Sequence, residues 1–555
     1  MGDFSTKGEP REASVAVSML ETGNWTLPSV YADEFAFKPP MAHWLMAAAS
    51  LPAGEVTEFS SRLPSAIAFI VLAGFMLAFF GKRLRFQEAF IATLLFVSCI
   101  EIHRAAMTAR VDMLLTAFIV IGLFQLYRWE DTDELKGLPV QIPILLGLAT
   151  LTKGPVGIIL PLFVFGVYLL TLRKYAFKTI FKSLLYSGIS SLFIPIVWYV
   201  AAWKRGGDDF LNLVLAENFG RFFSTSSDNI SYALGHENGF FYNFQTLILG
   251  FMPWTVLFIF SLFGLKISFP HKSLKQAAND CRRSILSMEK EKLLSLVAIV
   301  CVIVFYSIPS SKRSVYLLPA YPFISLFLAQ YALYTTEYRR LVTRTFAWFM
   351  GILVTLVTVA IGLLMAGVVS INGIADSNIW IARLMTQADF TKYIINPDVI
   401  SIVIYIALLA ALATLFYQLF KKNNLKILYA TIALTLVSYL IINGVIMRSV
   451  SENTSSKEFA NTVIKELPIS DQNMFVINNL RKYTNLYGLN FYLGNKFHDL
   501  DKANPKEGFF FCTQKDLDKI INDYSNTYTF TEIMKSDKRI KDVRDEICVL
   551  RIVKK

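Results

Sequence analysis

The sequence predicts a polytopic α-helical membrane protein that carries a small α/β domain at its C-terminal end. Hydrophobic residues make up 54% of the 555 residues, and only 17% are charged. Apolar runs of about 18 or more residues, long enough to cross a bilayer, recur between residues 63 and 450. After residue 450 they give way to short apolar segments separated by polar turns. A water-soluble protein of this length would carry far more charge, so that class is excluded.

The N-terminal stretch Gly8–Pro40 is rich in ionisable residues although no predicted span begins before residue 63. We expect residues 1–62 to form a loop outside the cytoplasm. Residues 9–21 have the spacing of an amphipathic helix, and residues 40–51 form a second short apolar helix. Both are too short to cross a bilayer, so we expect amphipathic helices that lie flat on the membrane surface.

About twelve spans are predicted within residues 63–450, which we assign as the transmembrane domain. They cover 63–81, 88–100, 113–127, 141–152, 154–171, 183–203, 245–265, 293–309, 315–334, 346–369, 398–419 and 426–446. Two alternatives stand at Thr152–Pro155: one long kinked span, or two short spans joined by a tight turn. A lysine beside Gly-Pro favours the turn.

The basic residues concentrate in alternate short loops, which predicts that those loops face the cytoplasm. Residues 1–62 and 451–555 then face outward. An even number of spans puts the N-terminal segment outside as well, and nothing before Gly8 would carry it across the membrane. Either the translocation machinery moves this short segment unaided, or a span precedes Met1, and we favour the second alternative. This distribution also explains the net charge of +12, so we predict contacts with membrane lipids and no nucleic-acid partner.

Residues 451–555 are expected to fold as a small α/β domain on the outer surface. The predicted strands are 473–478, 488–493, 508–512, 526–531 and 546–553, and the predicted helices are 456–466 and 514–523. Cys512 and Cys548 have two interpretations: a disulfide in an oxidising compartment, or two separate buried residues.

Eleven ionisable residues lie in outward loops close to span ends. They are Glu9, Arg11, Lys38, Arg62, Arg110, Asp112, Lys153, Glu217, Arg221, Lys312 and Arg313. Taken singly, Arg62 can snorkel to the interface, and Lys312 and Arg313 can anchor there. Asp112 can simply pair with Arg110. Together on one side, however, such charges are typical of a polar cavity that serves a site.

Several cations with a few carboxylates suit the binding of a lipid phosphate beside an activated hydroxyl. Arginine and lysine bind the phosphate and stabilise it as it leaves, while a carboxylate takes the hydroxyl proton. Nucleotide sugars are absent outside the cytoplasm, so an activated sugar donor there has to be linked to a lipid.

Seven motifs extend this interpretation along nearly the whole chain. They are GEPREA at 8–13, FAFKPP at 35–40 followed by Trp44, RVDM at 110–113, LTKGP at 151–155, ENFGRF at 217–222, GFMPW at 250–254 and KRSVYLLPAYP at 312–322. In this order they resemble the integral-membrane glycosyltransferases of the GT-C superfamily. The lipid A aminoarabinose transferases and the protein O-mannosyltransferase-like enzymes are the most similar groups.

The resemblance implies a GT-C fold with a span before the first loop. It also implies an inverting pentosyl- or hexosyltransferase that uses a polyprenyl-phosphate-linked sugar and no cofactor. The acceptor would be a lipid such as lipid A, or another envelope glycan, on the periplasmic side of a bacterial inner membrane. Two alternatives remain: a protein O-mannosyltransferase-like enzyme, and a transporter or flippase for a lipid phosphate.

The resemblance also implies roles for individual residues. The leading acid of the family's first loop falls on Gly8, so either Glu9 or Asp112 is the catalytic base. The donor phosphate is expected to bind Lys38, Arg221, Lys312 and Arg313. The substrate cavity is expected to include Arg11, Arg62, Arg110, Lys153, Glu217 and Tyr316. Phe37 stands where the aminoarabinose transferases have an acidic metal ligand, so we predict no metal site; His236 is expected to shape its loop.

Overall fold

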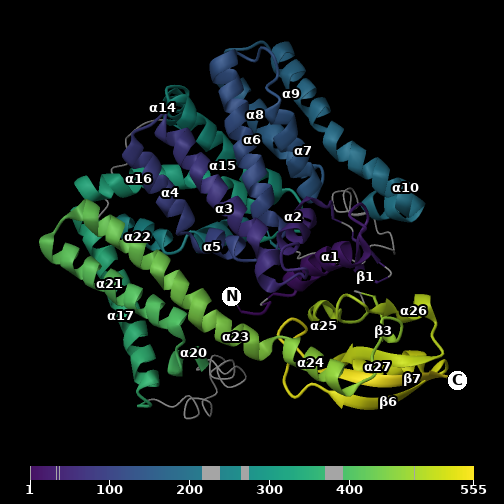
Figure 1. Cartoon of the computed structure of the whole chain (residues 1–555). Helices are drawn as coiled ribbons and strands as arrows, with labels where there is room; N and C mark the ends of the chain where they lie inside the picture. The colour runs from purple at the N-terminus through teal and green to yellow at the C-terminus, as the bar shows by residue number, and fades with distance from the viewer. Residues whose placement is uncertain are drawn as a thin grey trace.

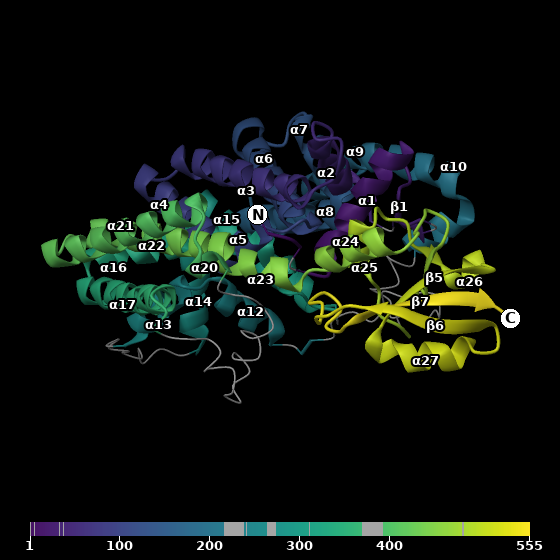
Figure 2. The same ribbon diagram turned by 60° about the horizontal axis from the view of Figure 1, so that its bottom comes forward.

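The computed structural model describes most of the chain. The described residues are 2–4, 6–32, 34–36, 38–215, 238–239, 241–263, 274–309, 311–368, 392–479 and 482–555. Helices form a broad layered body, and a single mixed sheet lies at the C-terminal end (Figures 1 and 2). The start of the chain lies between these two parts (Figure 1).

The first loop contains two helices and a small hairpin. In chain order these elements are α1 (Gly8–Thr22), β1 (Ser29–Tyr31), β2 (Glu34–Phe35) and α2 (Met41–Ser50). Helix α1 ends at Gly23, whose φ of 67° is in the left-handed region that glycine adopts without strain. The helices expected over 9–21 and 40–51 are therefore both present.

The helical body follows from residue 58 to residue 454. Its first half contains α3 (Glu58–Gly81), α4 (Phe86–Val97), α5 (Ile100–Ala106), α6 (Val111–Asp133), α7 (Gln141–Lys153), α8 (Val156–Leu172), α9 (Phe177–Ser191) and α10 (Phe193–Leu215). Its second half contains α12 (Tyr242–Gly250), α13 (Trp254–Leu262), α14 (Leu274–Leu286), α15 (Lys290–Ser307), η2 (Ser314–Ala320), α16 (Tyr321–Glu337), α17 (Arg340–Met365), α20 (Lys392–Ile395), α21 (Val399–Lys421), α22 (Asn424–Ile441), η3 (Ile442–Ile446) and α23 (Met447–Thr454).

The chain is a multi-pass membrane protein. Within the described residues, seven helices are long and apolar enough to cross a bilayer, or up to nine if each of two bent pairs is one span. All twelve predicted segments coincide with helical structure, but several helices are too short to pass that test alone. The difference arises because polar and Gly-Pro sequences break the apolar runs into shorter helices.

The break at Gly154–Pro155 separates two short helices, as the favoured alternative predicted. Helix α7 ends at Lys153, Gly154 has a φ of 83°, and α8 begins at Val156. The two helices pack against each other rather than forming one kinked rod. This turn places the Lys153 side chain at the end of the helix pair, where the partly buried lysine reaches Asp112.

Two bent helix pairs meet in the body, and Tyr439 joins them. Helices α4 and α5 meet at 67°, and α12 and α13 meet at 102°. The Tyr439 hydroxyl of α22 lies 3.0 Å from the Ser98 carbonyl oxygen and 3.2 Å from the Met252 carbonyl oxygen. The helix breaks leave these two oxygens without partners inside a helix, and the single O–H of Tyr439 is within reach of both. Trp254 Nε1 donates to Ser98 Oγ at 3.0 Å. Such side chains satisfy backbone groups that lipid cannot.

The C-terminal domain contains a five-stranded mixed sheet with helices packed on it. Its elements are α24 (Lys457–Glu466), β3 (Met474–Val476), α25 (Tyr487–Tyr492), β4 (His498–Asp499), α26 (Leu500–Ala503), β5 (Glu507–Thr513), α27 (Gln514–Tyr524), β6 (Tyr528–Lys535) and β7 (Ile547–Lys554). The strand order is β4-β3-β5-β7-β6. Strand β3 is parallel to β4 and β5, whereas β7 is antiparallel to β5 and β6. The predicted small α/β domain is confirmed.

The strand predicted over 488–493 is wrong, because this segment forms helix α25. Leu489 and Phe491 are buried in the core that the C-terminal domain shares with the first loop. Burial on several sides produces a continuous apolar run that resembles a strand, and periodicity alone cannot separate the two. Cys512 and Cys548 are directly opposed on β5 and β7, and both are free and buried.

Helix α1 is buried rather than spread along an open surface. It contacts α2 on one side and α25 of the C-terminal domain on the other. Ala13, Ala16 and Met19 are fully covered and share one apolar core with Tyr487. The C-terminal domain therefore covers α1, and the expected position of this helix flat on the membrane surface stays a prediction.

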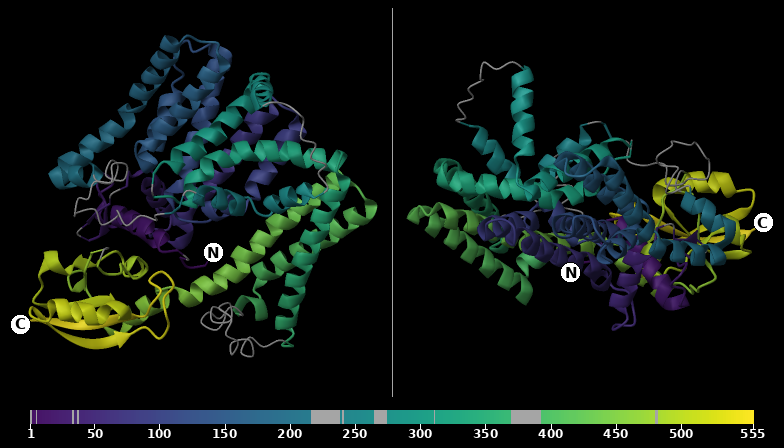
Figure 3. Two further views of the ribbon diagram at one scale, coloured as in Figure 1. Left: turned by 180° about the vertical axis from the view of Figure 1, so that it is seen from behind. Right: turned by 90° about the horizontal axis from the view of Figure 1, so that it is seen from above.

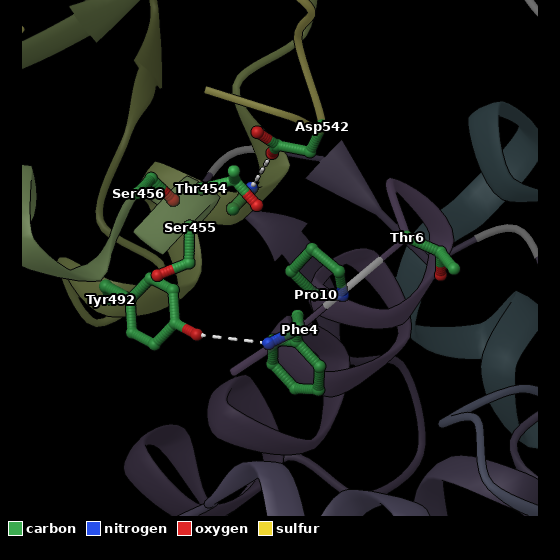
Figure 4. Close-up of a pocket in the computed structure, with 9 residues that line it drawn as sticks. Phe4, Thr6, Pro10, Thr454, Ser455, Ser456, Tyr492 and Asp542 are labelled. Atoms are coloured by element: carbon green, nitrogen blue, oxygen red, sulfur yellow. Dashed lines mark hydrogen bonds between the residues drawn. The ribbon is translucent and has the colours of Figure 1, made fainter. Parts of the chain in front are cut away.

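The N-terminal segment is also bonded to the C-terminal domain. Figure 4 shows the contact, where the Phe4 N–H donates to the Tyr492 hydroxyl at 3.5 Å in a pocket that Asp542 also lines. Ser455 Oγ donates to a carboxylate oxygen of Asp3 at 2.6 Å. The boundary expected after residue 450 falls inside α23, which continues from α22 through η3 toward this domain (Figure 3). The N-terminal segment and helix α1 are therefore both attached to the C-terminal domain.

Candidate functional site

Charged side chains from distant parts of the chain meet at one end of the helical body. They come from the start of α1, the loop that contains Lys38, the start of α6, the α7–α8 turn and the loop before η2. Ion pairs and short-range electrostatic interactions connect them. We call Arg11, Glu12, Lys38, His43, Arg110, Asp112, Lys153, Arg313 and Tyr316 the loop-end cluster.

Asp112 is the carboxylate at the α6 side of this cluster. It lies in the first turn of α6, where free backbone N–H groups favour a negative charge. Lys153 donates to its Oδ1, and Arg110 Nε lies 3.5 Å from its Oδ2. The ammonium of Lys153 also lies 4.4 Å from the centre of the Tyr316 ring. The cations on either side are 20% exposed, whereas Asp112 is 5% exposed.

Glu12 is the carboxylate at the α1 side of the cluster. Its Oε1 accepts hydrogen bonds from Lys38 and from Arg11, with Arg11 Nη2 at 2.5 Å. Its Oε2 lies 2.9 Å from Nε2 of His43. Burial alone would raise the pKa of Glu12, but Lys38 and Arg11, together with the His43 hydrogen bond, hold it well below its ordinary value. Glu12 is therefore ionised, and both of its carboxylate oxygens have hydrogen-bond partners.

Lys38 is a cation whose charge depends on its surroundings. Burial lowers its pKa to about 7, and the attraction of Glu12 opposes that change. The like charges of Arg11 and Arg110 contribute to the same lowering of the Lys38 pKa. An ammonium with this pKa loses its proton as the pH rises through the neutral range.

Arg313 completes the cationic side of the cluster. Its guanidinium interacts electrostatically with Tyr316, Arg110 and Asp112. Its Nε is buried and has no hydrogen-bond partner in the part of the chain that the structure describes. A buried donor without a partner costs free energy, and an anionic ligand oxygen would satisfy it.

Gly8 faces the cluster from the first residue of α1. A Cβ atom placed on Gly8 would lie 2.7 Å from Nη1 of Arg110. The position where the family's leading acid is expected, Gly8, therefore lies directly against the Arg110 guanidinium. Glycine leaves this space to Arg110, and only the flexible end of that side chain would have to move for a larger residue.

Glu9 is separately enclosed and does not share these partners. Its Oε1 accepts from Arg62 Nε at 2.8 Å and from the Ala109 N–H at 3.2 Å. Its Oε2 accepts from the N–H and the hydroxyl of Thr6, both at 3.2 Å. Arg62 in turn donates to the carbonyl oxygens of Gly2 and Asp3. Both oxygens of Glu9 are therefore occupied by groups that fasten the N-terminal segment.

Lys312 is the remaining predicted site residue that the structure describes. Lys312 is buried, and its ammonium donates to the Asn238 carbonyl oxygen at 3.2 Å. Asn238 returns a hydrogen bond to the Lys312 carbonyl oxygen at 3.0 Å. Glu217, Arg221 and His236 fall outside the described residues. Their expected roles stay predictions.

Glu12 and His43 were not predicted as site residues. Glu12 lies four residues after Gly8, so both occupy one face of α1. Because Gly8 faces the cluster, a residue four positions later on the same helix is expected to face it too. This spacing is the sequence signal that could have identified Glu12. His43 follows Lys38 by five residues with a helix start between them, and sequence alone contains no signal for its contact with Glu12.

A metal centre of the kind known in aminoarabinose transferases does not fit these side chains. Across the described ranges, no group of three or more His, Cys, Asp and Glu side chains is arranged to hold an ion. Glu12 and His43 are adjacent, but the carboxylate already binds Lys38 and Arg11. We derive no chemical step through a metal.

Comparisons with known proteins show what this chain is similar to. The family model described as dolichyl-phosphate-mannose-protein mannosyltransferase matches residues 37–199. The crystal structure of ArnT from Cupriavidus metallidurans bound to undecaprenyl phosphate has a TM-score of 0.66 with this chain at 16% identity. That match covers 99% of this chain and 94% of the other. The chain therefore has the polytopic helical fold of that structure, as predicted.

Curated relatives of this chain include a group of sugar transferases. Undecaprenyl phosphate-alpha-4-amino-4-deoxy-L-arabinose arabinosyl transferases are 23% identical over 329 residues in Enterobacter sp. (strain 638) and 24% over 351 residues in Aeromonas salmonicida (strain A449). These matches cover 58% and 62% of this chain. They span 54% and 59% of the relatives' own length. The resemblance to aminoarabinose transferase-like GT-C proteins is confirmed.

Proposed function

We propose that the chain is a glycosyltransferase that moves a sugar from a polyprenyl-phosphate donor to a lipid acceptor. The observation that carries the proposal is the loop-end cluster, in which an ionised carboxylate lies among several cations at one end of the membrane helices. The names of the curated relatives and the undecaprenyl phosphate bound to the structural neighbour support the same donor class.

Asp112 serves as the general base in this proposal. It takes the proton of the acceptor hydroxyl, and the hydroxyl oxygen attacks the anomeric carbon of the donor sugar. The bond from that carbon to the lipid phosphate breaks, and the phosphate leaves with the bonding electrons. The configuration at the anomeric carbon is thereby inverted. Asp112 is preferred to Glu9 because Glu9 is enclosed by Arg62, Ala109 and Thr6.

Lys38 and Arg313 stabilise the departing phosphate. Arg313 is positively charged, and Lys38 is charged below its pKa of about 7. Arg313 also has a buried N–H donor that lacks a partner among the described residues. Donors fixed in place before the reaction stabilise developing negative charge more effectively than water does. Arg221 remains a proposed additional phosphate ligand. Lys153 and Arg110 then hold Asp112 in position and keep it ionised.

Position in the cell follows from the same proposal. The donor lipid and the cluster both belong at the outer leaflet of a bacterial inner membrane, with residues 451–555 on the periplasmic side. Residues 1–62 are then the first outer loop, which the C-terminal domain covers. The charge bias of the loops supports this orientation.

The test is turnover of a labelled undecaprenyl-phosphate sugar by the purified full-length chain in lipid nanodiscs. We expect release of undecaprenyl phosphate when an acceptor lipid is present. Arg313→Ala should lower donor affinity at least tenfold, about the effect of one charge-assisted hydrogen bond. Arg551→Ala, an exposed arginine of the C-terminal sheet, is the matched control.

Other outcomes would identify the alternatives. Translocation of the donor across a vesicle membrane without cleavage would establish a transporter and overturn the proposal. Mass spectrometry of envelope lipids and glycoproteins, with and without the gene, tests the acceptor. Loss of a sugar from lipid A supports a lipid acceptor, whereas unchanged lipids with altered glycoproteins indicate the mannosyltransferase-like alternative.

A further inference from the structure

Glu12 connects Lys38 to the buried interior of the first loop. One of its oxygens, Oε1, faces Lys38 and Arg11, while the other, Oε2, is fixed by His43. The carboxylate is 2% exposed and the imidazole 1%, whereas the Lys38 side chain is 17% exposed. The Lys38 side chain is therefore partly exposed, whereas the Glu12 and His43 side chains that hold it are buried.

His43 orients the Glu12 carboxylate through a hydrogen bond. Because Glu12 is ionised and can only accept hydrogen bonds, Nε2 of His43 is assigned as the donor. Nδ1 of His43 is buried and has no hydrogen-bond partner among the described residues. The Glu12 contact is therefore the polar interaction that sets the orientation of the ring in the described structure. Helix α2, which begins three residues after Lys38, carries the ring.

We propose that Glu12, oriented by His43, is a positioning residue that keeps the Lys38 ammonium charged and directed toward the donor phosphate. The inference rests on the proposed function, in which Lys38 binds that phosphate. It assigns Glu12 no contact with the reacting atoms.

The charges around Lys38 show why such a residue is needed. Arg11 on α1 and Arg110 before α6 both oppose its positive charge, and burial opposes it as well. Glu12 is the hydrogen-bonded carboxylate that favours the charge, and Asp112 on α6 acts on it from a greater distance. Without Glu12, desolvation and the two arginines would favour a neutral amine, which attracts phosphate weakly.

The first experiment measures the charge of Lys38 without any donor. The purified full-length chain is pulsed with acetic anhydride at a series of pH values, and acetylation of Lys38 is followed by mass spectrometry. Since only the neutral amine reacts, the midpoint reports its titration. Glu12→Gln should lower this midpoint by about one pH unit or more. Glu21→Gln, a matched change at the exposed end of the same helix, should leave it in place. An unchanged midpoint in Glu12→Gln overturns the inference.

The second experiment measures binding of undecaprenyl phosphate across the same pH series. We expect Glu12→Gln to weaken binding about tenfold at pH 7.5. Arginine stays charged throughout, so Glu12→Gln combined with Lys38→Arg should bind within a few fold of Lys38→Arg alone. A merely structural role predicts no such rescue, and a double variant as weak as Glu12→Gln would overturn the inference.

The two experiments separate failure of the inference from failure of the proposed function. If the wild-type chain binds undecaprenyl phosphate but the Lys38 midpoint does not move in Glu12→Gln, only the proposed role of Glu12 is refuted. Absence of wild-type binding refutes the proposed donor, and with it the direction of Lys38 toward a lipid phosphate, even if the midpoint moves.

Discussion

Asp112→Asn is the most direct test of the proposed chemistry. The substitution keeps the shape of the side chain and removes the charge that would accept the hydroxyl proton. Lys153 binds Oδ1 and Arg110 lies near Oδ2, so the amide of asparagine keeps an acceptor oxygen for one of the two cations and turns its NH2 group toward the other. The change therefore isolates proton acceptance from architecture more cleanly than a truncation to alanine.

The expected magnitudes differ for chemistry, binding and stability. Loss of a general base lowers turnover by about 10²- to 10⁴-fold, or roughly 3–5 kcal/mol in the activation barrier. Donor binding should stay equal or become tighter, because the cluster gains one net positive charge. Stability should fall by about 1–3 kcal/mol, less than for a fully buried pair, because charged partners lose an ion pair but retain contact with solvent. Lys153 and Arg110 are each one fifth exposed, which supports that lower figure.

The assay measures these three quantities on one preparation. Turnover is followed at saturating undecaprenyl-phosphate sugar, donor binding is titrated separately, and thermal unfolding reports stability. Asp523→Asn is the matched control, because Asp523 forms a similar ion pair with Lys482 at 2.6 Å on the C-terminal domain. That control should retain wild-type turnover.

Two results would refute the reasoning about Asp112. Turnover above one tenth of the wild-type value in folded Asp112→Asn protein would exclude it as the base. Parallel losses of turnover and donor binding would show that Asp112 organises the cations instead of accepting a proton.

Three further predictions concern the first loop. Glu9→Gln should lower stability by about 3–5 kcal/mol, because it leaves Arg62 buried without a charged partner. Thermal unfolding measures this, and full stability with no turnover would instead support Glu9 as the base. Tyr31→Ala should destabilise the chain by about 3–5 kcal/mol, since Tyr31 is buried and stacks on Tyr487 at 5.5 Å. Limited proteolysis would detect release of the C-terminal domain, and Tyr31→Phe, which keeps the stack, should resist it. Donor binding should weaken as the pH rises through about 7, because Lys38 is charged below its lowered pKa and neutral above it; a pH titration of binding that stays flat from 6 to 8.5 would contradict this.

Much of the fold was predictable because membranes impose a simple rule on sequence. Every spanning segment needs a long apolar run, so composition alone located the helices of the body. The turn at Gly154–Pro155 followed from the same rule, because a lysine beside Gly-Pro does not suit the middle of a span. Segment 488–493 was misassigned because burial in a shared core removes the polar face by which α25 would have been recognised.

The candidate site was predictable in outline but not in its pairings. Residue type and motif order identified Asp112, Lys153 and Lys38, which the structure brings into one cluster. Sequence could not distinguish Glu9 from Glu12, since both lie in the first two turns of α1 and both are buried. Their different surroundings come from residues far along the chain. Glu9 meets Arg62 and Ala109, whereas Glu12 meets Lys38 and His43.

By itself, then, the sequence determined a polytopic membrane protein that resembles the GT-C glycosyltransferases, a C-terminal α/β domain and a set of charges near span ends. These properties follow from local composition and from motifs that neighbouring residues define. Only the tertiary structure decided that α1 is covered by the C-terminal domain and that Glu12, not Glu9, holds Lys38. The physical reason is that an ion pair depends on distance and burial. Both are set by contacts between segments that are remote in the chain.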